Sequence, residues 1–441
     1  MKGLLSFKHG VHPPENKDIT SGIASRRFPF PAEIILPLSQ HIGTPAEALV
    51  KPGDHVERGD VIAKAAGFIS SAVHATAAGT VKSIELWPHP SGIMAQSIRI
   101  DVDPNSSQMR RPRSVPHWQD VKEEELSKEI ARAGIVGLGG AAFPSHVKLT
   151  PPKDQPVELL LINACECEPY LTSDHRTMLE RPDDVYKGIR IELKALGITR
   201  AAIGIEANKP DAIEMMRKKK PDDLDVEIYA LQVKYPQGAE KMLIKAVTGR
   251  EVPSGSLPSA VGAMVQNVAT VANVAAAFET GQPLIERVIT VTGRGIRKPG
   301  NWIIPFGTKL RDVIAHCGGL TDDAAEIVFG GPMMGQSQAN LEVPILKATG
   351  GILVLSKDEC KKQEIMPCIR CGKCLEACPI FLNPQWMGDL AKAERYEELV
   401  EEAHLGDCML CGCCSFVCPS NIPLSQLFTA ARNQMKRLTT I

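Results

Sequence analysis

Near its C-terminal end the chain carries the same cysteine spacing twice. The first run, CIRCGKCLEACP, begins at Cys368, and the second, CMLCGCCSFVCP, begins at Cys408. Both runs follow the pattern C-x2-C-x2-C-x3-C-P, and the second repeats the first at an offset of 40 residues. This duplication constrains the fold more than any other feature, because eight thiols must be brought around shared centres.

The spacing indicates two [4Fe–4S] clusters with crossed ligands. In bacterial runs of this kind the fourth cysteine binds the other cluster. One cluster is therefore expected on Cys368, Cys371, Cys374 and Cys418, and the other on Cys408, Cys411, Cys414 and Cys378. Structural zinc is the alternative, but zinc sites usually pair two C-x2-C halves across a longer loop. Cys413 breaks the repeat and is expected to be a bystander.

Charge and composition exclude several classes of protein. The chain has 441 residues, enough for about three domains of ~150 residues, and a net charge of −1. A nucleic-acid partner is not expected, because such proteins normally show a basic face. The thirteen cysteines form an odd number, and the start, MKGLLSFKHGVHPPE, lacks the apolar core of a signal peptide. Both features favour a reducing compartment over a disulfide framework.

The longest apolar stretch does not have the composition of a membrane span. It covers residues 260–278 but contains Gln266, Asn267, Thr270 and Asn273. Such polar groups are costly inside a bilayer, so a buried helix of a soluble domain is expected. Membrane association would then come through partner subunits.

The remaining pattern predicts a multi-domain α/β chain with four regions. Short strands and tight turns in residues 1–104 predict a β-sandwich of the lipoyl-like hybrid kind, without a lysine at a hairpin tip for lipoylation. A polar linker at 104–117 leads to residues 118–282, where strands and helices alternate as in a parallel sheet. Residues 283–356 suggest a β-grasp domain. Residues 360–441 suggest a helical ferredoxin domain, because a 29-residue insert separates the two runs.

A flavin is expected as the link between the clusters and a nicotinamide. Clusters carry single electrons and nicotinamide exchanges a hydride, whereas a flavin can do both. The segment GLGGAA at 137–142 fits the loose dinucleotide pattern, but it follows a helix rather than a strand. Lys148 could add a positive charge near a phosphate. Asn163 ends a buried-type strand, at the edge where parallel sheets bind ligands, and Glu166 and Glu168 follow it.

Longer segments resemble a known family. GLGGAAFPSHVKL, INACECEPYLTSDHR, YPQGAEKMLIKAVTGREVPSG and VQNVATVANV, together with KHGVHPPE and the double cysteine run, resemble the RnfC subunit of the Rnf ion-translocating electron-transport complex. The flavin region is similar to the NADH- and FMN-binding subunit of respiratory complex I. The resemblance implies FMN over the glycine loop, with NAD(H) stacked on it. It assigns these contacts to Gly137, Gly139, Gly140, Ala141, Phe143, Lys148, Asn163, Glu166, Gly238, Glu240 and Asn273.

Three positions depart from the family pattern. Ala142 stands in place of a glycine, Cys165 in place of a small residue and His175 in place of an acid. Ala142 is expected to tighten the loop, and His175 weakens any acid role at its position. Cys165 is expected to be a packed thiol.

The resemblance implies a role within a larger assembly. It predicts a peripheral subunit on the cytoplasmic face of the bacterial inner membrane, in a ferredoxin:NAD⁺ oxidoreductase coupled to Na⁺ or H⁺ movement. Its partners would be the iron–sulfur subunit RnfB, the membrane subunits, NADH or NAD⁺ and, indirectly, ferredoxin. No side chain is expected to act as acid or base. The alternative is a non-enzymatic iron–sulfur relay and docking subunit without a working nucleotide site.

Overall fold

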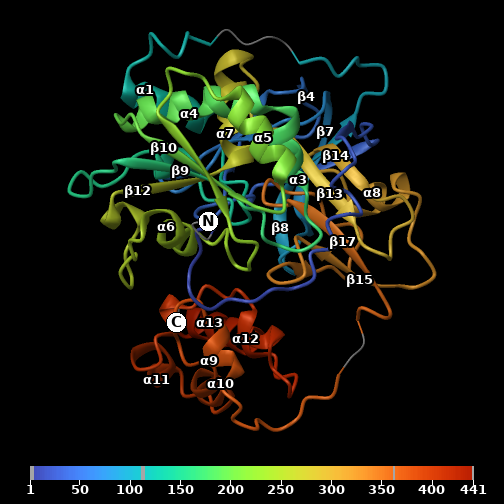
Figure 1. Cartoon of the computed structure of the whole chain (residues 1–441). Coiled ribbons are helices and arrows are strands. Elements are labelled where there is room, and N and C mark those ends of the chain that lie inside the picture. Colours follow the sequence, from blue (N-terminus) through green and yellow to red (C-terminus); the bar gives the residue numbers. More distant parts are fainter. Residues whose placement is uncertain (1–3, 111–114, 361–362, 440–441) are drawn as a thin grey trace.

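The computed structural model describes residues 4–110, 115–360 and 363–439, so part of the predicted linker, residues 111–114, lies outside the described residues. Figure 1 shows a mixed α/β body with a separate group of helices at the C-terminal end. The N-terminal domain contains two small sheets. One has the order β2-β8-β7-β4 and the other β3-β5-β6. Their strands are β2 (Glu33–Pro37), β3 (Glu47–Ala48), β4 (His55–Val56), β5 (Val61–Lys64), β6 (Val73–His74), β7 (Gly79–Pro88) and β8 (Met94–Val102).

Buried and polar side chains alternate along β8 in the larger N-terminal sheet. In β8 Ile98 and Ile100 are fully buried, whereas Arg99 between them reaches the carboxylate of Glu33 at 2.6 Å. Successive side chains of a strand point to opposite faces, so one face of β8 enters the core and the other carries the ion pair.

A parallel four-stranded sheet forms the central domain. Its order is β11-β10-β9-β12, as the alternating pattern predicted. The strands are β9 (Leu159–Ala164), β10 (Ala201–Glu206), β11 (Val226–Leu231) and β12 (Ala263–Asn267). The helices are α1 (Glu123–Arg132), α2 (Ser145–Lys148), α3 (Ser173–Glu180), α4 (Pro182–Leu196), α5 (Pro210–Lys219), α6 (Glu240–Thr248) and α7 (Val268–Glu279), with a short 3₁₀ turn, η1 (Pro258–Val261).

The prediction of a single buried helix over residues 260–278 is wrong. This stretch divides into strand β12 and helix α7 at Asn267. The side chain of Asn267 accepts hydrogen bonds from the backbone N–H groups of Ala269 and Thr270, at 2.9 and 3.2 Å. This is an N-cap, which starts a helix by satisfying its first free donors. Asn267 also pairs in register with Asn163 on β9.

The third domain is a six-stranded mixed sheet with the order β1-β14-β13-β17-β15-β16. Its strands and helix are β13 (Glu286–Thr292), β14 (Gly300–Pro305), α8 (Leu310–His316), β15 (Ala324–Phe329), β16 (Gln336–Ser337) and β17 (Gly351–Ser356). The edge strand β1 (Arg26–Arg27) comes from the N-terminal segment and pairs in parallel with β14. The N-terminal segment is therefore shared between domains.

The C-terminal domain is helical, and its two halves repeat the backbone as well as the cysteines. Arg370 and Leu410 have φ of 55° and 56°, and Gly372 and Gly412 have φ of 80° and 79°. Each glycine directly precedes a short helix. The helices are α9 (Lys373–Ala377), α10 (Pro384–Lys392), α11 (Tyr396–Glu401), η2 (Leu405–Asp407), α12 (Cys413–Phe416) and α13 (Leu424–Thr439).

The N-terminal segment passes between the body and the C-terminal helices, as the blue trace in Figure 1 shows. Gly10 donates its N–H to the carbonyl of Ala377 at 3.2 Å, and Val11 exchanges backbone hydrogen bonds with Tyr235. None of the helices formed by the described residues is long and apolar enough to cross a membrane.

Candidate cofactor sites

Two hollows in the C-terminal domain divide the eight cysteines of the runs between them. The cysteines of the inner hollow are Cys378, Cys408, Cys411 and Cys414, with Cys413 also at its wall. The cysteines of the outer hollow are Cys368, Cys371, Cys374 and Cys418. In each hollow three cysteines come from one run and one from the other, which is the crossed grouping that the spacing predicts.

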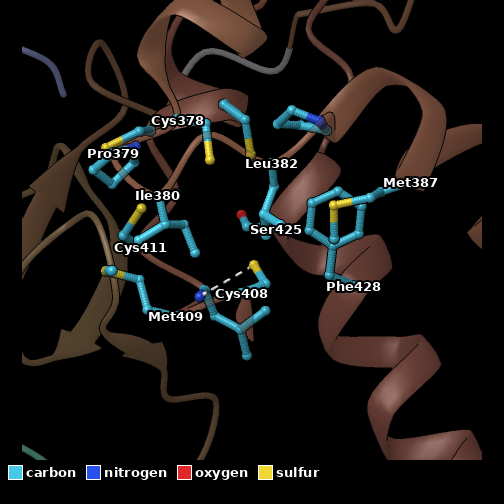
Figure 2. A pocket seen from close by; sticks show the side chains of 15 residues that line it. Cys378, Pro379, Ile380, Leu382, Met387, Cys408, Met409, Cys411, Ser425 and Phe428 are labelled. Atoms are coloured by element: carbon cyan, nitrogen blue, oxygen red, sulfur yellow. Dashed lines mark hydrogen bonds between the residues drawn. The ribbon is translucent and has the colours of Figure 1, made fainter. Parts of the chain in front are cut away.

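Figure 2 shows the inner hollow from close by. The sulfur atoms of Cys378 and Cys408 face each other across it, and Cys411 approaches from a third side. Apolar side chains of Ile380 and Phe428 complete the lining. A hollow lined by sulfur and apolar side chains suits an iron–sulfur cluster, whose reduction potential depends on burial and on hydrogen bonds to its sulfurs.

The backbone offers matching hydrogen bonds to the first thiol of each run. The N–H of Leu410 lies 3.5 Å from Sγ of Cys408, drawn as the dashed line in Figure 2. The N–H of Arg370 lies 3.4 Å from Sγ of Cys368. Both donors come from residues with positive φ, so the repeated backbone conformation aims an N–H at sulfur in both halves.

The sulfurs are not arranged for a single ion. No group of three or more His, Cys, Asp or Glu side chains in the described ranges could hold one metal ion. Zinc would need its sulfurs at about 2.3 Å from one centre, whereas a [4Fe–4S] cluster takes one thiolate at each iron corner and holds them further apart. The crossed grouping, with three cysteines from one run and one from the other in each hollow, is the ligand pattern of paired [4Fe–4S] clusters.

The inner hollow lies directly against the central domain. The buried Tyr235 hydroxyl, from the segment after β11, donates to the carbonyl of Cys411 at 2.8 Å. Nδ1 of His9 lies 3.1 Å from the carbonyl oxygen of Cys378. Cys413 packs in the same apolar cluster, and its Sγ lies 3.9 Å from the carbonyl oxygen of Tyr235. The position of Cys413 facing the body, at the wall of the inner hollow, is compatible with a packing role.

The outer hollow is open to solvent by contrast. Cys368 and Cys371 are exposed, and so are all residues from 363 to 371. The apolar side chains of Ile365, Met366 and Ile369 are 58%, 50% and 68% exposed. Of these three side chains, Ile369 lines the outer hollow.

In the central domain the glycine loop bends over the C-terminal edge of the sheet. The N–H of Gly137 donates to the carbonyl of Phe143 at 2.8 Å, which closes the loop. The N–H of Leu138 donates to the hydroxyl of Thr270 on α7 at 2.8 Å. Gly139, Gly140 and Ala141, in the middle of the loop, are exposed. Among the described residues, no atom would come within 4 Å of a Cβ placed on Gly140, so a ligand can approach the backbone there.

Polar side chains lie close to Gly139 at the end of strand β12. A Cβ on Gly139 would lie 3.5 Å from Cβ of Asn267, whose Nδ2 donates to Asp174 at 2.7 Å. Glu166 accepts from the N–H groups of Asp174 and His175, at 2.8 and 3.1 Å, and so caps α3. Burial, and then the nearby Glu166, raise the pKa of Asp174 to about 7. Sequence patterns do not place Asn267 and Asp174 at the site, because their proximity depends on the division between β12 and α7.

Lys148 and Glu240 form a second polar group at the same edge. Nζ of Lys148 lies 2.7 Å from the Glu240 carboxylate and donates to the carbonyl of Val265 at 3.0 Å. Asn163 donates to the carbonyl of Gly238 at 2.7 Å. The structure thus brings these four predicted residues together in two pairs at the ends of β9 and β12.

The side chains of two predicted or altered positions, Asn273 and His175, have other partners. Asn273 lies further along α7, and its amide donates to the carbonyl of Ala269 in the same helix at 2.8 Å. His175 is buried and pairs with Asp211 at 2.8 Å. The resemblance assigned Asn273 to the pocket, but its side chain is engaged within its own helix.

The residues around the loop fit a polar, anionic ligand such as FMN. Oδ1 of Asp174 and Nε of Arg287 are buried without a hydrogen-bond partner among the described residues. Arg287 otherwise donates to the carbonyls of Leu138 and Lys347, at 3.0 and 2.9 Å. Buried polar atoms are rarely left without a hydrogen-bond partner. The unpaired donor and acceptor beside the exposed glycine loop therefore indicate that ligand atoms bind there.

Comparison with known families accounts for all four domains. An RnfC barrel sandwich hybrid domain matches residues 5–105, and a Nuo51 FMN-binding domain matches 130–276. An SLBB domain matches 288–337, and a 4Fe-4S dicluster domain matches 364–422. The predicted fold class is confirmed.

Several characterised proteins are similar to the chain over most of its length. The C subunit of a proton-translocating ferredoxin:NAD(+) oxidoreductase complex of Clostridium ljungdahlii is 45% identical over 92% of this chain and 88% of its own. The C subunit of the Na(+)-translocating complex of Acetobacterium woodii is 40% identical over 89% of each chain. The C subunit of an ion-translocating oxidoreductase complex of Rhodobacter capsulatus is 42% identical over 86% of this chain and 74% of its own.

A solved structure shares the fold. The crystal structure of an NAD⁺-reducing [NiFe]-hydrogenase in the H₂-reduced state matches 72% of this chain and 62% of its own, with a TM-score of 0.50 and 19% identity. At 19% identity this similarity shows a shared fold and nothing about function.

Proposed function

The chain belongs to the RnfC family, the C subunits of ion-translocating ferredoxin:NAD(+) oxidoreductase complexes, and from that premise we propose how it serves such a complex. It is the subunit that exchanges a hydride between NAD(H) and a bound FMN and passes single electrons through two [4Fe–4S] clusters. FMN supplies the change between two-electron and one-electron chemistry. The chain's own residues hold, orient and shield these groups, and none acts as acid or base.

The flavin would lie over the glycine loop. The backbone of Gly139 to Ala141 is open for a phosphate or ring, and Lys148 supplies a positive charge at the edge of the sheet. The remaining contacts are assigned to Gly137, Phe143, Asn163, Glu166, Gly238 and Glu240, to which the geometry adds Asn267 and Asp174. Asn273 is assigned by the resemblance alone, because its amide donates to the carbonyl of Ala269 within α7.

The clusters would occupy the two hollows. The inner one is held by Cys378, Cys408, Cys411 and Cys414, and the outer one by Cys368, Cys371, Cys374 and Cys418. The observation that carries the proposal is the position of the inner hollow, whose Cys411 carbonyl is bonded to Tyr235 of the flavin-domain edge. From this position we infer that the inner cluster is the first to receive an electron from the flavin and the outer cluster the second.

We infer that a partner subunit docks at the outer hollow. Exposed Ile369 and Leu375 line it, and exposed Ile365 and Met366 precede Cys368 in the chain. The partner would be the iron–sulfur subunit RnfB of the complex, which would cover these apolar side chains when it docks. Ferredoxin would be reached indirectly. Membrane subunits would move Na⁺ or H⁺ and hold this chain at the cytoplasmic face of the bacterial inner membrane.

The domain boundaries remain part of the proposal. We place them at 1–104, 118–282, 283–356 and 360–441, and the family matches support this division. Strand β1 is an exception within the first region, because it completes the sheet of the third.

Anaerobic purification of the full chain tests the proposed function. The purified protein is expected to contain one FMN and about eight irons with equal sulfide, as two four-iron clusters require. NADH is expected to bleach the flavin absorbance and then reduce the clusters. Iron and sulfide without flavin would support the non-enzymatic relay instead. A colourless protein without iron would contradict both.

A further inference from the structure

A lysine of the N-terminal segment is buried against the turn that follows β9. Nζ of Lys17 donates to the backbone carbonyls of Glu166, Glu168 and Leu171, at 2.9, 2.8 and 2.6 Å. The residue is only 9% exposed. Three acceptors around one nitrogen need three N–H donors, which the charged ammonium of lysine has. One buried cation therefore fixes the path of the turn at residues 166–171.

The turn needs this support because its backbone is strained. Glu166 and Tyr170 have φ of 51° and 69°, in the left-handed region that residues with a side chain rarely adopt. Such conformations persist where the surroundings hold them. The N–H of Tyr170 donates to the carbonyl of Glu15 at 2.8 Å, and the Glu15 carboxylate accepts from the amide of Asn208 at 2.6 Å. The N-terminal segment thus holds the turn through Glu15 as well as through Lys17.

One carboxylate of the turn reaches the edge of the sheet where the glycine loop lies. Glu166 accepts from the N–H of Asp174 at 2.8 Å. The side chain of Asp174 accepts in turn from Asn267, which lies beside Gly139 of the loop. The position of the turn therefore sets the position of a carboxylate that the resemblance assigns to the flavin pocket.

The other carboxylate, two residues further on, reaches the third domain and the wall of the inner hollow. Glu168 accepts from the N–H groups of Met333 and Met334, at 3.1 and 2.9 Å. Met333 packs against the apolar cluster that contains Cys411 and Cys413. The turn that Lys17 holds thus lies between the glycine loop and the inner hollow.

We propose that Lys17 is a positioning residue for the flavin site, which holds the turn at 166–171 so that Glu166 meets the flavin. The inference rests on the proposed function, in which FMN lies over the glycine loop and Glu166 contacts it. Lys17 itself touches neither flavin nor nucleotide, because the backbone carbonyls occupy its ammonium group. Without that group three carbonyls lose a donor, and the turn shifts to find others. Hydride transfer depends steeply on geometry, so such a shift slows it.

FMN binding to the full chain tests this inference without requiring catalysis. The anaerobically purified protein is freed of flavin, and quenching of FMN fluorescence during titration gives the dissociation constant. Lys17→Met should keep the iron content of wild type but bind FMN about tenfold more weakly, the scale of one hydrogen bond to a charged group. Arg58→Met is the matched control and should bind FMN normally. Arg58 also joins two domains through a backbone carbonyl, that of Thr76 at 3.2 Å, and bonds Glu286 at 2.6 Å.

The NADH reaction separates positioning from plain stability. With FMN and NADH at saturation, Lys17→Met should bleach about tenfold more slowly, while the KM for NADH changes little. Lys17→Arg keeps a charged donor and should recover most of the rate. Glu166→Gln alone should also slow bleaching. Adding Lys17→Met to Glu166→Gln should cause little further loss, because residues that act through one another are not additive.

Failures of the two claims are distinguishable. Equal FMN affinity and bleaching rate in wild type and Lys17→Met, even with a lower melting temperature, overturn the inference and leave the proposed function standing. Losses that add fully to those of Glu166→Gln overturn it too. If Lys17→Met does not fold with its iron, Lys17→Gln, whose amide has two N–H donors, is judged by the same criteria. A wild type that binds FMN but is not bleached by NADH contradicts the proposed function, and the FMN affinity of Lys17→Met still decides the inference.

Discussion

Buried ionisable side chains distinguish the central domain at the scale of single residues. Glu192 on α4 is fully buried, and neither of its carboxylate oxygens has a partner among the described residues. Burial raises its pKa to about 8. A charge without a partner is very costly in an apolar interior, so this carboxyl is held in its neutral form at neutral pH.

The free energy of unfolding of the flavin domain should therefore depend on pH through the titration of Glu192. The folded protein keeps the Glu192 proton up to about pH 8, whereas the unfolded chain releases it near the ordinary value of 4.5. Between these values the folded state binds more protons, so the free energy of unfolding falls as pH rises. Glu192→Gln removes this titration, and its stability relative to wild type should increase from pH 4.5 to 8 and then stay level. The temperature at which flavin is released, followed by fluorescence, measures the stability of both proteins across this pH range. Parallel pH profiles of Glu192→Gln and wild type would refute the prediction.

Asn267 joins a structural and a binding role in one side chain. Asn267→Ala removes the cap of α7 and the side chain beneath Gly139. We expect a loss of about 1 kcal/mol from the cap and a lower ratio of flavin to protein. Asn383→Ala is the matched control, because Asn383 caps α10 through the N–H of Trp386 at 3.1 Å. The control should lose stability but keep its flavin, and equal flavin content in both variants would argue against a site role for Asn267.

At the scale of elements, the sequence predicts best what is fixed locally. The cysteine grouping follows from spacing, and the structure repeats it with matching φ at Arg370 and Leu410. The alternation of strands and helices likewise predicts the parallel sheet. The division between β12 and α7 was missed because no glycine or proline marks it, and a side-chain cap sets it. The pairing of β1 with β14 was missed because residues distant in sequence form it.

Ligand removal tests the crossed grouping directly. Cys378 lies in the first run but lines the inner hollow with the second, and Cys418 shows the reverse. Cys378→Ala should therefore damage the inner cluster and spare the outer one, and Cys418→Ala should do the opposite. Cys413→Ala is the control and should keep both clusters. Iron content and paramagnetic resonance of the reduced proteins measure this. Damage that follows the runs, with Cys378 grouped with Cys368, would contradict the crossed assignment.

At the scale of the whole molecule, polar contacts of the described residues join the C-terminal domain to the body. A buried one joins the Tyr235 hydroxyl to the carbonyl of Cys411 at 2.8 Å. Figure 1 shows these helices below the sheet domains, with the N-terminal segment between them. Electron transfer from the flavin therefore depends on a contact that can be weakened without touching a cofactor ligand.

Tyr235→Phe should loosen this contact while leaving the ring in place. A lost hydrogen bond of this kind costs about 1 kcal/mol. We expect full flavin and iron content, an unchanged rate of flavin bleaching by NADH and slower reduction of the clusters. Tyr229→Phe is the control, because that hydroxyl bonds only the nearby Glu227 on the same strand among the contacts of the described residues. Rapid-mixing absorbance separates the two steps, and equal cluster reduction in both variants would refute the role of Tyr235.

The central claim is the order of transfer, from flavin to the inner cluster and then to the outer one. Freeze-quenched paramagnetic resonance after mixing with NADH tests it most directly in Cys378→Ala and Cys418→Ala. With the inner cluster damaged, NADH should bleach the flavin but leave the outer cluster oxidised on the time scale of the wild-type reaction. With the outer cluster damaged, the inner one should be reduced at the wild-type rate. Prompt reduction of the outer cluster in Cys378→Ala would contradict the account.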